Sequence, residues 1–236
     1  MAKKSVTKRK TRRSTVKSRK RSGRKRPDKA LCILVTGFGP FPGAPVNPTG
    51  ALIAALARKL RSASGPIHIA THVFPTTYAA VDRDLPRLLA RTKPHVLLMF
   101  GLATRSRGIR VETRARNRIC NGPDAAGITP QTRMIAAGAP PTMPIRAPQA
   151  ALLRAAKSGA LPARLSINAG DYLCNYLYWR ALEAVRRGSG PSRAAFIHVP
   201  PLDIKTSGGS ARTLGNLVVC AEAIAAAMIR ALRTRR

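Results

Sequence analysis

A cysteine stands at the point where a helix is predicted to begin. The segment INAGDYLCN joins a short predicted strand to a predicted helix and places Cys174 in the first turn of that helix. Unpaired backbone amides and the positive end of the helix dipole lower a thiol pKa at such a position, and they can also stabilise an oxyanion. Cys174 is therefore a candidate nucleophile, although a single cysteine near a helix start is more often a small core residue.

A histidine and a glutamate could complete a catalytic group with this thiol. The segment FIHVP places His198 at the end of a predicted strand. Parallel strands bring their carboxyl ends to one edge of a sheet, so His198 could reach Cys174 there and act as its general base. Glu112, in IRVETRARN, is a candidate to orient the imidazole, because the other two glutamates fall within predicted helices. Taken singly, a histidine at a strand end is more often a hydrogen-bonded core residue.

Other chemistries fit the sequence poorly. Gly37, Gly39 and Gly43 follow the first predicted strand with the spacing GxGxxxG, whereas a dinucleotide site has GxGxxG. Phe38 and Phe41 would also crowd a pyrophosphate. The chain has no GxxxxGK[ST], GxSxG, CxxC or HExxH motif, and its four cysteines are widely spaced. We therefore expect neither a bound nucleotide nor a metal or other cofactor.

Strands and helices alternate along the chain. Continuous apolar runs or short apolar patterns predict strands at 31–36, 67–74, 95–100, 164–168 and 194–199. Helical periodicity predicts helices at 49–61, 79–91, 147–157, 172–187 and 214–232. Residues 114–146 are rich in Pro, Gly and Arg and show little periodicity. This alternation indicates an α/β fold, a three-layer αβα sandwich around a mostly parallel twisted sheet.

The charge is extreme for a chain of 236 residues. Lys and Arg number 43 against nine acidic residues, which gives a formal charge of +34. Residues 1–29 are dense in Lys and Arg and poor in apolar residues, so we expect a disordered tail followed by one hydrolytic domain at 30–236. The tail is either a weak tether for nucleic acid or another polyanion or simply a solvated extension. The basic body indicates either an anionic partner or a compositional bias toward arginine.

No segment of the sequence indicates a membrane or an export route. The N-terminal charges are not followed by an apolar stretch, and the longest unbroken apolar run, 96–103, is far shorter than the roughly 18–20 residues needed to cross a bilayer. We therefore expect a soluble, cytoplasmic protein in a reducing compartment.

Four motifs in order resemble the pyroglutamyl-peptidase I family, also called pyrrolidone-carboxylate peptidases. VTGFGPFPGAPVNP at 35–48 is similar to the family's VTGFxPFGGxxxNP, and it is followed by IRVETRARN, INAGDYLCN and FIHVP. The resemblance runs from about 33 to 232. It implies a cysteine exopeptidase, or omega-peptidase, that hydrolyses an N-terminal pyroglutamyl residue from peptides through a thioester and without metal. It also implies a homo-oligomer, because members commonly form them.

The resemblance assigns roles to individual residues. The triad falls on Cys174 as nucleophile, His198 as acid and base, and Glu112 as orienting group. The blocked end of the substrate is a neutral planar lactam, which suits aromatic faces and a few hydrogen bonds. The substrate-binding residues implied by the family's motifs are Phe38, Phe41, Asn47, Tyr172 and Leu173.

The sequence also departs from the family pattern. Pro42 replaces a glycine, Leu102 stands where many members have glutamine, and Asp171 replaces a small hydroxyl residue three positions before the nucleophile. Residues 118–123 lack the family's DDARIP-like stretch. These departures leave two alternatives open, a related cysteine hydrolase with altered N-terminal specificity and a non-enzymatic basic protein that binds polyanions and keeps the fold.

Overall fold

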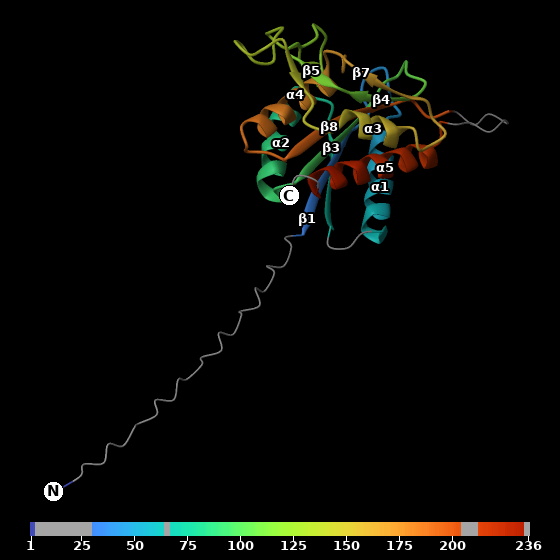
Figure 1. Cartoon of the computed structure of the whole chain (residues 1–236). Coiled ribbons are helices and arrows are strands. Elements are labelled where there is room, and N and C mark those ends of the chain that lie inside the picture. The colour runs from blue at the N-terminus through green and yellow to red at the C-terminus, as the bar shows by residue number, and fades with distance from the viewer. Residues whose placement is uncertain (3–29, 64–66, 204–211, 234–236) are drawn as a thin grey trace.

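The computed structural model describes residues 1–2, 30–63, 67–203 and 212–233 (Figure 1). The strands are β1 (Leu31–Phe38), β2 (Ile67–Phe74), β3 (Val96–Leu102), β4 (Ile109–Glu112), β5 (Arg114–Arg116), β6 (Thr142–Pro144), β7 (Ala163–Ser166) and β8 (Arg193–Val199). The helices are α1 (Thr49–Ala63), α2 (Tyr78–Thr92), α3 (Gln149–Ala156), α4 (Leu173–Arg186) and α5 (Leu214–Arg233). Residues 3–29 of the predicted tail lie outside the described residues.

Six strands form one mixed sheet in the order β2-β1-β3-β8-β4-β7. Four of the five neighbouring pairs are parallel, and only β4 and β8 run antiparallel to each other. The central strands β1, β3 and β8 are almost wholly buried, as expected for strands covered on both faces. The predicted α/β fold with a mostly parallel sheet is confirmed.

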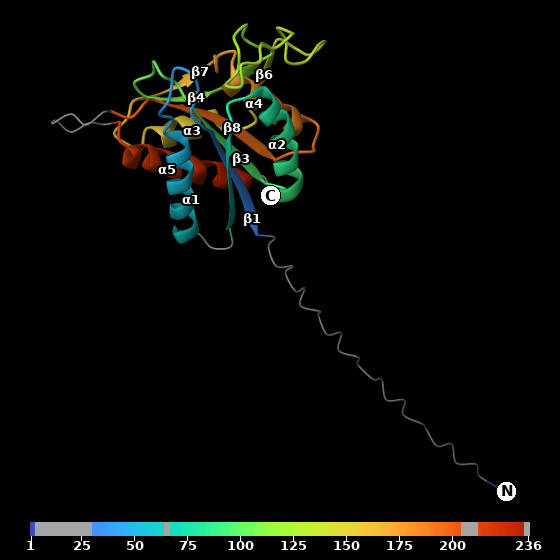
Figure 2. The same cartoon turned by 180° about the vertical axis from the view of Figure 1, so that it is seen from behind.

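Helices cover both faces of this sheet. Figures 1 and 2 show α1, α3 and α5 on one face and α2 with α4 on the other. The two largest fully buried side chains are Trp179 and Tyr178 of α4, and both belong to the hydrophobic core. The three layers bring the start of α4 and the ends of β1, β3 and β8 to the same edge of the sheet.

The prediction was wrong where strands are short and carry charges. All five predicted strands and all five predicted helices are present, but three further strands were not predicted. These are β4 at 109–112, and β5 and β6, which pair with each other inside the region predicted to be irregular. The sequence of β4, IRVE, is too short and too polar to show an apolar run. It is paired on both sides, with β8 and with β7, so its partners stabilise it rather than its own pattern.

The last helix is long and apolar. Within the described residues, α5 alone has the length and composition of a membrane-crossing helix. One side of it is buried, including Leu217, Ile224 and Met228, and it packs against α1 and α3. The core helix of a layered sandwich has the same composition.

Candidate active site

A small cavity gathers almost every residue that the sequence analysis selected. It has a volume of about 170 Å³. Its lining consists of Phe38, Phe41, Asn47, Thr76, Leu102, Ala169, Tyr172, Leu173, Cys174 and His198. Glu112 lies behind His198 rather than in the lining. The structure therefore brings together all eight predicted site residues, which come from four separate parts of the chain.

A tight turn delivers Cys174 to this cavity. The chain leaves β7 and turns at Gly170, whose φ of 86° is in the left-handed region that favours glycine. The Asn168 side chain accepts a hydrogen bond from the Gly170 amide at 3.0 Å and holds the turn. The helix α4 then begins at Leu173 with no side-chain cap, so Cys174 lies in its first turn as predicted.

The thiol lies directly above a glycine of the neighbouring strand. A Cβ atom added to Gly101 of β3 would lie 2.7 Å from Cys174 Sγ and 2.8 Å from a ring carbon of Phe196. Both distances are shorter than van der Waals contact allows, so any side chain at position 101 would displace the thiol or the ring. Gly101 therefore sets how closely Cys174 can approach the end of the sheet.

His198 and Glu112 form a buried, directional pair. Nδ1 of His198 donates to Oε1 of Glu112 at 2.8 Å, and both side chains are almost completely buried. The two residues lie diagonally across the antiparallel β4–β8 pair, in which Glu112 is opposite Phe196 and Arg110 is opposite His198. This contact fixes the tautomer that carries the proton on Nδ1 and leaves Nε2 able to accept one.

Arg110 holds the same carboxylate from the other side. Its Nη2 lies 3.1 Å from Oε1 of Glu112 and donates to Oγ of Ser166 at 2.9 Å and to the carbonyl of Asn168. Burial alone raises the pKa of the Glu112 carboxyl, but the hydrogen bond from His198 and the charges of His198 and Arg110 outweigh it. The pKa of Glu112 therefore lies below its ordinary value, and the group is an anion at neutral pH.

The thiol pKa differs from the sequence-based expectation. Burial raises the pKa of Cys174 to about 12, and the charge of Glu112 adds to this shift while Arg110 opposes it. The helix start was expected to lower this pKa. However, the hydration energy that a thiolate loses on burial exceeds the stabilisation that the amides of one helical turn provide. At neutral pH the Cys174 thiol therefore keeps its proton, so any reaction through its sulfur needs a base.

The raised pKa predicts how the free protein reacts with iodoacetamide. The alkylation rate of Cys174 should rise about tenfold per pH unit from pH 7 to 9 without reaching a plateau, because the thiolate fraction follows the pH far below the pKa. Peptide mass spectrometry would measure labelling at Cys174 against time at each pH. A rate that is already constant from pH 6 upward would instead show a preformed thiolate.

Aromatic rings form one wall of the cavity. Phe41 and Tyr172 lie with their ring centroids 6.4 Å apart, and Phe38 is almost fully buried against Phe74. The Asn47 side chain is engaged within its own loop, because it donates to the carbonyl of Gly39 at 3.0 Å and accepts from the Thr49 amide at 3.1 Å. Asn47 therefore shapes the loop that follows β1 and carries Phe41.

Asp171 does not line the cavity that holds Cys174. It lies 3.8 Å from Arg118 in an ion pair and lines a different cavity of about 930 Å³, together with residues of the 116–121 and 133–142 segments. Residues 118–123 do approach the aromatic wall, since the Tyr172 hydroxyl donates to the carbonyl of Pro123 at 3.4 Å. The acidic departure from the family pattern thus leaves the lining of the Cys174 cavity without a carboxylate.

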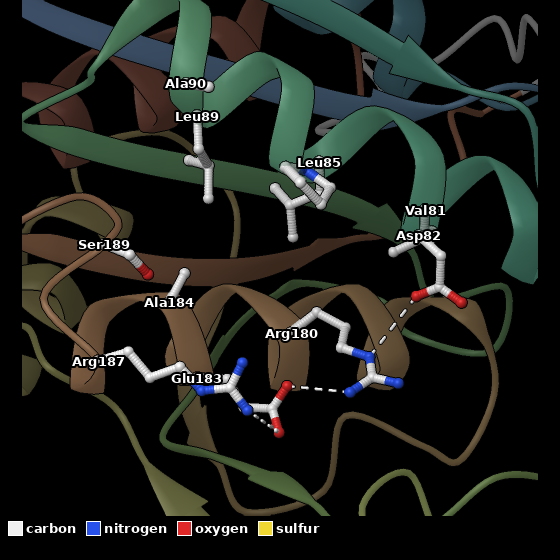
Figure 3. Close-up of a pocket in the computed structure, with 11 residues that line it drawn as sticks. Val81, Asp82, Leu85, Leu89, Ala90, Arg180, Glu183, Ala184, Arg187 and Ser189 are labelled. Carbon is white, nitrogen blue, oxygen red and sulfur yellow. Dashed lines mark hydrogen bonds and ion pairs between the residues drawn. The ribbon is translucent and has the colours of Figure 1, made fainter.

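A further cavity, of about 440 Å³, lies between α2 and α4 (Figure 3). Its floor is apolar, and Arg180 at its rim lies 3.6 Å from Asp82 and 3.0 Å from Glu183. Figure 3 shows that the Arg180–Asp82 pair joins α4 to α2, whereas the Arg180–Glu183 pair lies within α4. The lining contains no cysteine or histidine, and its only hydroxyl is that of Ser189. This cavity offers packing and charge pairing rather than a reactive group.

Sequence reasoning missed three residues that shape the site. Arg110 contacts the candidate triad, Gly101 admits the thiol, and Thr76 lines the cavity. The only signal for Arg110 was its position two residues before Glu112, which becomes informative once β4 is known to be a strand. Within the described residues no group of three or more His, Cys, Asp or Glu side chains could hold a metal ion.

Comparison with known proteins gives one consistent result. Residues 31–234 match the family described as pyroglutamyl peptidase. The chain is 32% identical to a pyrrolidone-carboxylate peptidase of Thermococcus onnurineus over 71% of this chain and 82% of that protein. It is 34% identical to that of Gloeobacter violaceus over 72% and 82%. The solved pyrrolidone carboxyl peptidase of Thermococcus litoralis superposes with a TM-score of 0.77 and 28% identity, covering 87% of this chain and 96% of that one.

Proposed function

Because this chain belongs to the pyroglutamyl peptidase family of cysteine hydrolases, we propose that it removes N-terminal pyroglutamate from peptides with Cys174 as its nucleophile. His198 acts as general base and then general acid, and Glu112 orients it. One observation carries the assignment of roles, the 2.8 Å hydrogen bond from His198 to Glu112 at the wall of the cavity that holds Cys174. A thiol, an imidazole and a buried carboxylate in this order are the components of a cysteine-peptidase triad.

The first chemical step forms a thioester. As Cys174 Sγ attacks the carbonyl carbon of the pyroglutamyl group, His198 Nε2 takes the thiol proton, which matches a thiol that is neutral at rest. The carbonyl oxygen becomes an oxyanion, and the uncapped amides at the start of α4 are placed to stabilise it. The tetrahedral intermediate then expels the amine of the next residue, which receives the proton from His198.

The second step releases the product. Water attacks the thioester carbon while His198 accepts its proton, and the carbon–sulfur bond breaks to return that proton to Cys174. Glu112 faces the imidazolium in both steps, and its lowered pKa keeps it anionic while His198 carries the positive charge. Free pyroglutamate and the shortened peptide leave, so atoms and charges balance without a cofactor.

The shape of the cavity supports a lactam as the bound end. A volume of about 170 Å³ suits a single five-membered ring, and the rings of Phe38, Phe41 and Tyr172 offer flat apolar contact. The lining holds no acidic side chain to pair with a free amino terminus, because Asp171 pairs with Arg118 elsewhere. An ordinary charged N-terminus would lose its hydration there without gaining a counterion.

A matched panel of reporters tests this function. Fluorogenic amides of pyroglutamate, proline, alanine and glutamine would be compared under reducing conditions. Proline keeps the five-membered ring but adds a charged amine. We expect the pyroglutamyl amide to be cleaved at least about 100-fold faster than each of the others, because a buried unpaired charge costs several kcal/mol. Preferential cleavage of a free aminoacyl reporter by the folded, reduced protein would support altered specificity instead.

A further inference from the structure

A second cavity opens beside His198 on the side away from the aromatic wall. It has a volume of about 440 Å³ and shares Leu102, Ala169 and His198 with the cavity that holds Cys174. The two cavities are therefore neighbours with a common wall, and the imidazole of His198 borders both. Nothing in the proposed cleavage of the lactam end uses this second cavity.

The register of the sheet leads from the thiol to this cavity. Gly101 of β3, which lies beneath Cys174, is opposite His198 of β8. His198 is opposite Arg110 of β4, and Arg110 is opposite Arg164 of β7. Side chains at directly opposed positions share one face of a sheet. A row of residues thus runs from the nucleophile past the general acid to two arginines.

The charge of the second cavity is entirely positive. Arg105, Arg110 and Arg164 line it, and its lining includes no aspartate or glutamate. Arg110 is occupied by Glu112. Across 30–63, 67–203 and 212–233, no acidic side chain pairs with Arg105 or Arg164. Other arginines do have an acidic partner, namely Arg118, Arg180 and Arg187. Two exposed guanidinium groups therefore face a cavity without an anion of their own.

The direction of proton transfer places the leaving peptide in this cavity. The lactam fills the small aromatic cavity, and the scissile bond lies at Cys174. His198 must donate its proton to the departing amine, so the residue that follows pyroglutamate lies on the His198 side. The second cavity is the described space that borders His198 on that side. The group that faces Arg105 and Arg164 is then carried by the residue after pyroglutamate.

We propose that the cavity lined by Arg105 and Arg164 binds the leaving part of the substrate and selects peptides with a carboxylate on the residue that follows pyroglutamate. This inference rests on the proposed function and adds a substrate class to it. Guanidinium groups bind carboxylates by paired hydrogen bonds, and they attract them over several ångströms at low salt. The carboxylate could be a side chain or the free C-terminus of a dipeptide.

Four substrates distinguish a side-chain carboxylate from a C-terminal carboxylate. Pyroglutamyl-alanine amide has no carboxylate, pyroglutamyl-alanine has a terminal one, pyroglutamyl-glutamate amide has one in the side chain, and pyroglutamyl-lysine amide carries the opposite charge. We expect at least one carboxylate substrate to exceed the alanine amide about tenfold in kcat/KM, and the lysine amide to fall below it. Raising the salt concentration from about 0.05 M to 0.5 M should reduce the preference, because exposed charges are screened.

Charge-neutralising variants locate the preference. Arg105→Gln and Arg164→Gln should each lower the carboxylate preference about three- to fivefold, the size expected for an exposed charge pair, and the double variant should nearly abolish it. Arg87→Gln is the matched control, because Arg87 is an exposed residue of α2 that lines neither cavity. It changes the net charge equally and should leave the preference intact. Hydrolysis of the alanine amide should change less than twofold in Arg87→Gln, since Arg87 lines neither cavity.

The outcomes distinguish this inference from the proposed function. A preference that is lost in the Arg105 and Arg164 variants and kept in the Arg87 variant supports the inference, and the preferred substrate identifies the source of the carboxylate. Equal cleavage of the neutral and acidic substrates overturns the inference but leaves the proposed function standing. A preference that Arg87→Gln reduces as much as the others also overturns it, because general charge then explains it. Failure to cleave any of the four overturns the proposed function itself.

Discussion

Hydrolysis of a pyroglutamyl amide is expected to fall by at least about 10⁴-fold when Cys174 is replaced by alanine. Without the sulfur no thioester forms, and loss of the nucleophile in a catalytic triad removes nearly all of the catalysis that the triad supplies. The remaining cavity should still bind the lactam, so the loss should appear in kcat rather than in KM. Steady-state kinetics with a fluorogenic pyroglutamyl amide would measure both.

Cys120→Ala provides a matched control for this variant. Cys120 is also a partly exposed free thiol near the site, with its Sγ 3.6 Å from the hydroxyl of Tyr78. It lies outside the cavity that holds Cys174, so its loss should change kcat less than about threefold. Thermal denaturation of both variants would confirm that they are folded. Substantial activity in a folded Cys174→Ala protein would exclude Cys174 as the nucleophile.

Replacing Glu112 by glutamine should lower kcat by about 10³-fold. The substitution keeps the shape of the side chain but removes the negative charge that faces the imidazolium, and it permits the unproductive tautomer of His198. The partly buried guanidinium of Arg110, 3.1 Å from the carboxylate, would also lose its anion. We therefore expect a lower melting temperature as well as lower activity, with little change in KM.

Asp171→Asn serves as the control for the loss of one carboxylate near the site. Asp171 lines a different cavity and pairs with Arg118, so this variant should keep kcat within about threefold. Kinetics at several pH values, with a parallel unfolding curve, would separate loss of catalysis from loss of folding. If Glu112→Gln kept nearly full activity, Glu112 would have a purely structural role.

The parts of the structure with long apolar patterns were predictable from the sequence. The central strands are continuous apolar runs because both of their faces are buried, and these runs placed β1, β3 and β8 correctly. The position of Cys174 in the first turn of α4 followed from the change between a strand pattern and a helix pattern. The order of strands along the chain then indicated which ends share an edge of the sheet.

What the sequence could not show depends on pairing between distant segments. The strand β4 has four residues and owes its existence to β7 and β8, so no local pattern indicated it. Its antiparallel alignment with β8 is what places Arg110 and Glu112 around His198. The raised pKa of Cys174 likewise arises from burial by the assembled fold, which outweighs the helix start that the local sequence indicated.

The most direct test of the central claim is to trap the covalent intermediate. An activated pyroglutamyl ester should acylate the protein faster than the thioester hydrolyses, so acid quenching during turnover would capture the acyl-enzyme. Mass spectrometry should find one added pyroglutamyl group on the peptide that contains Cys174 and none in Cys174→Ala. Rapid turnover by the wild-type protein with the added group on another residue, or with Cys174→Ala equally active, would contradict the account.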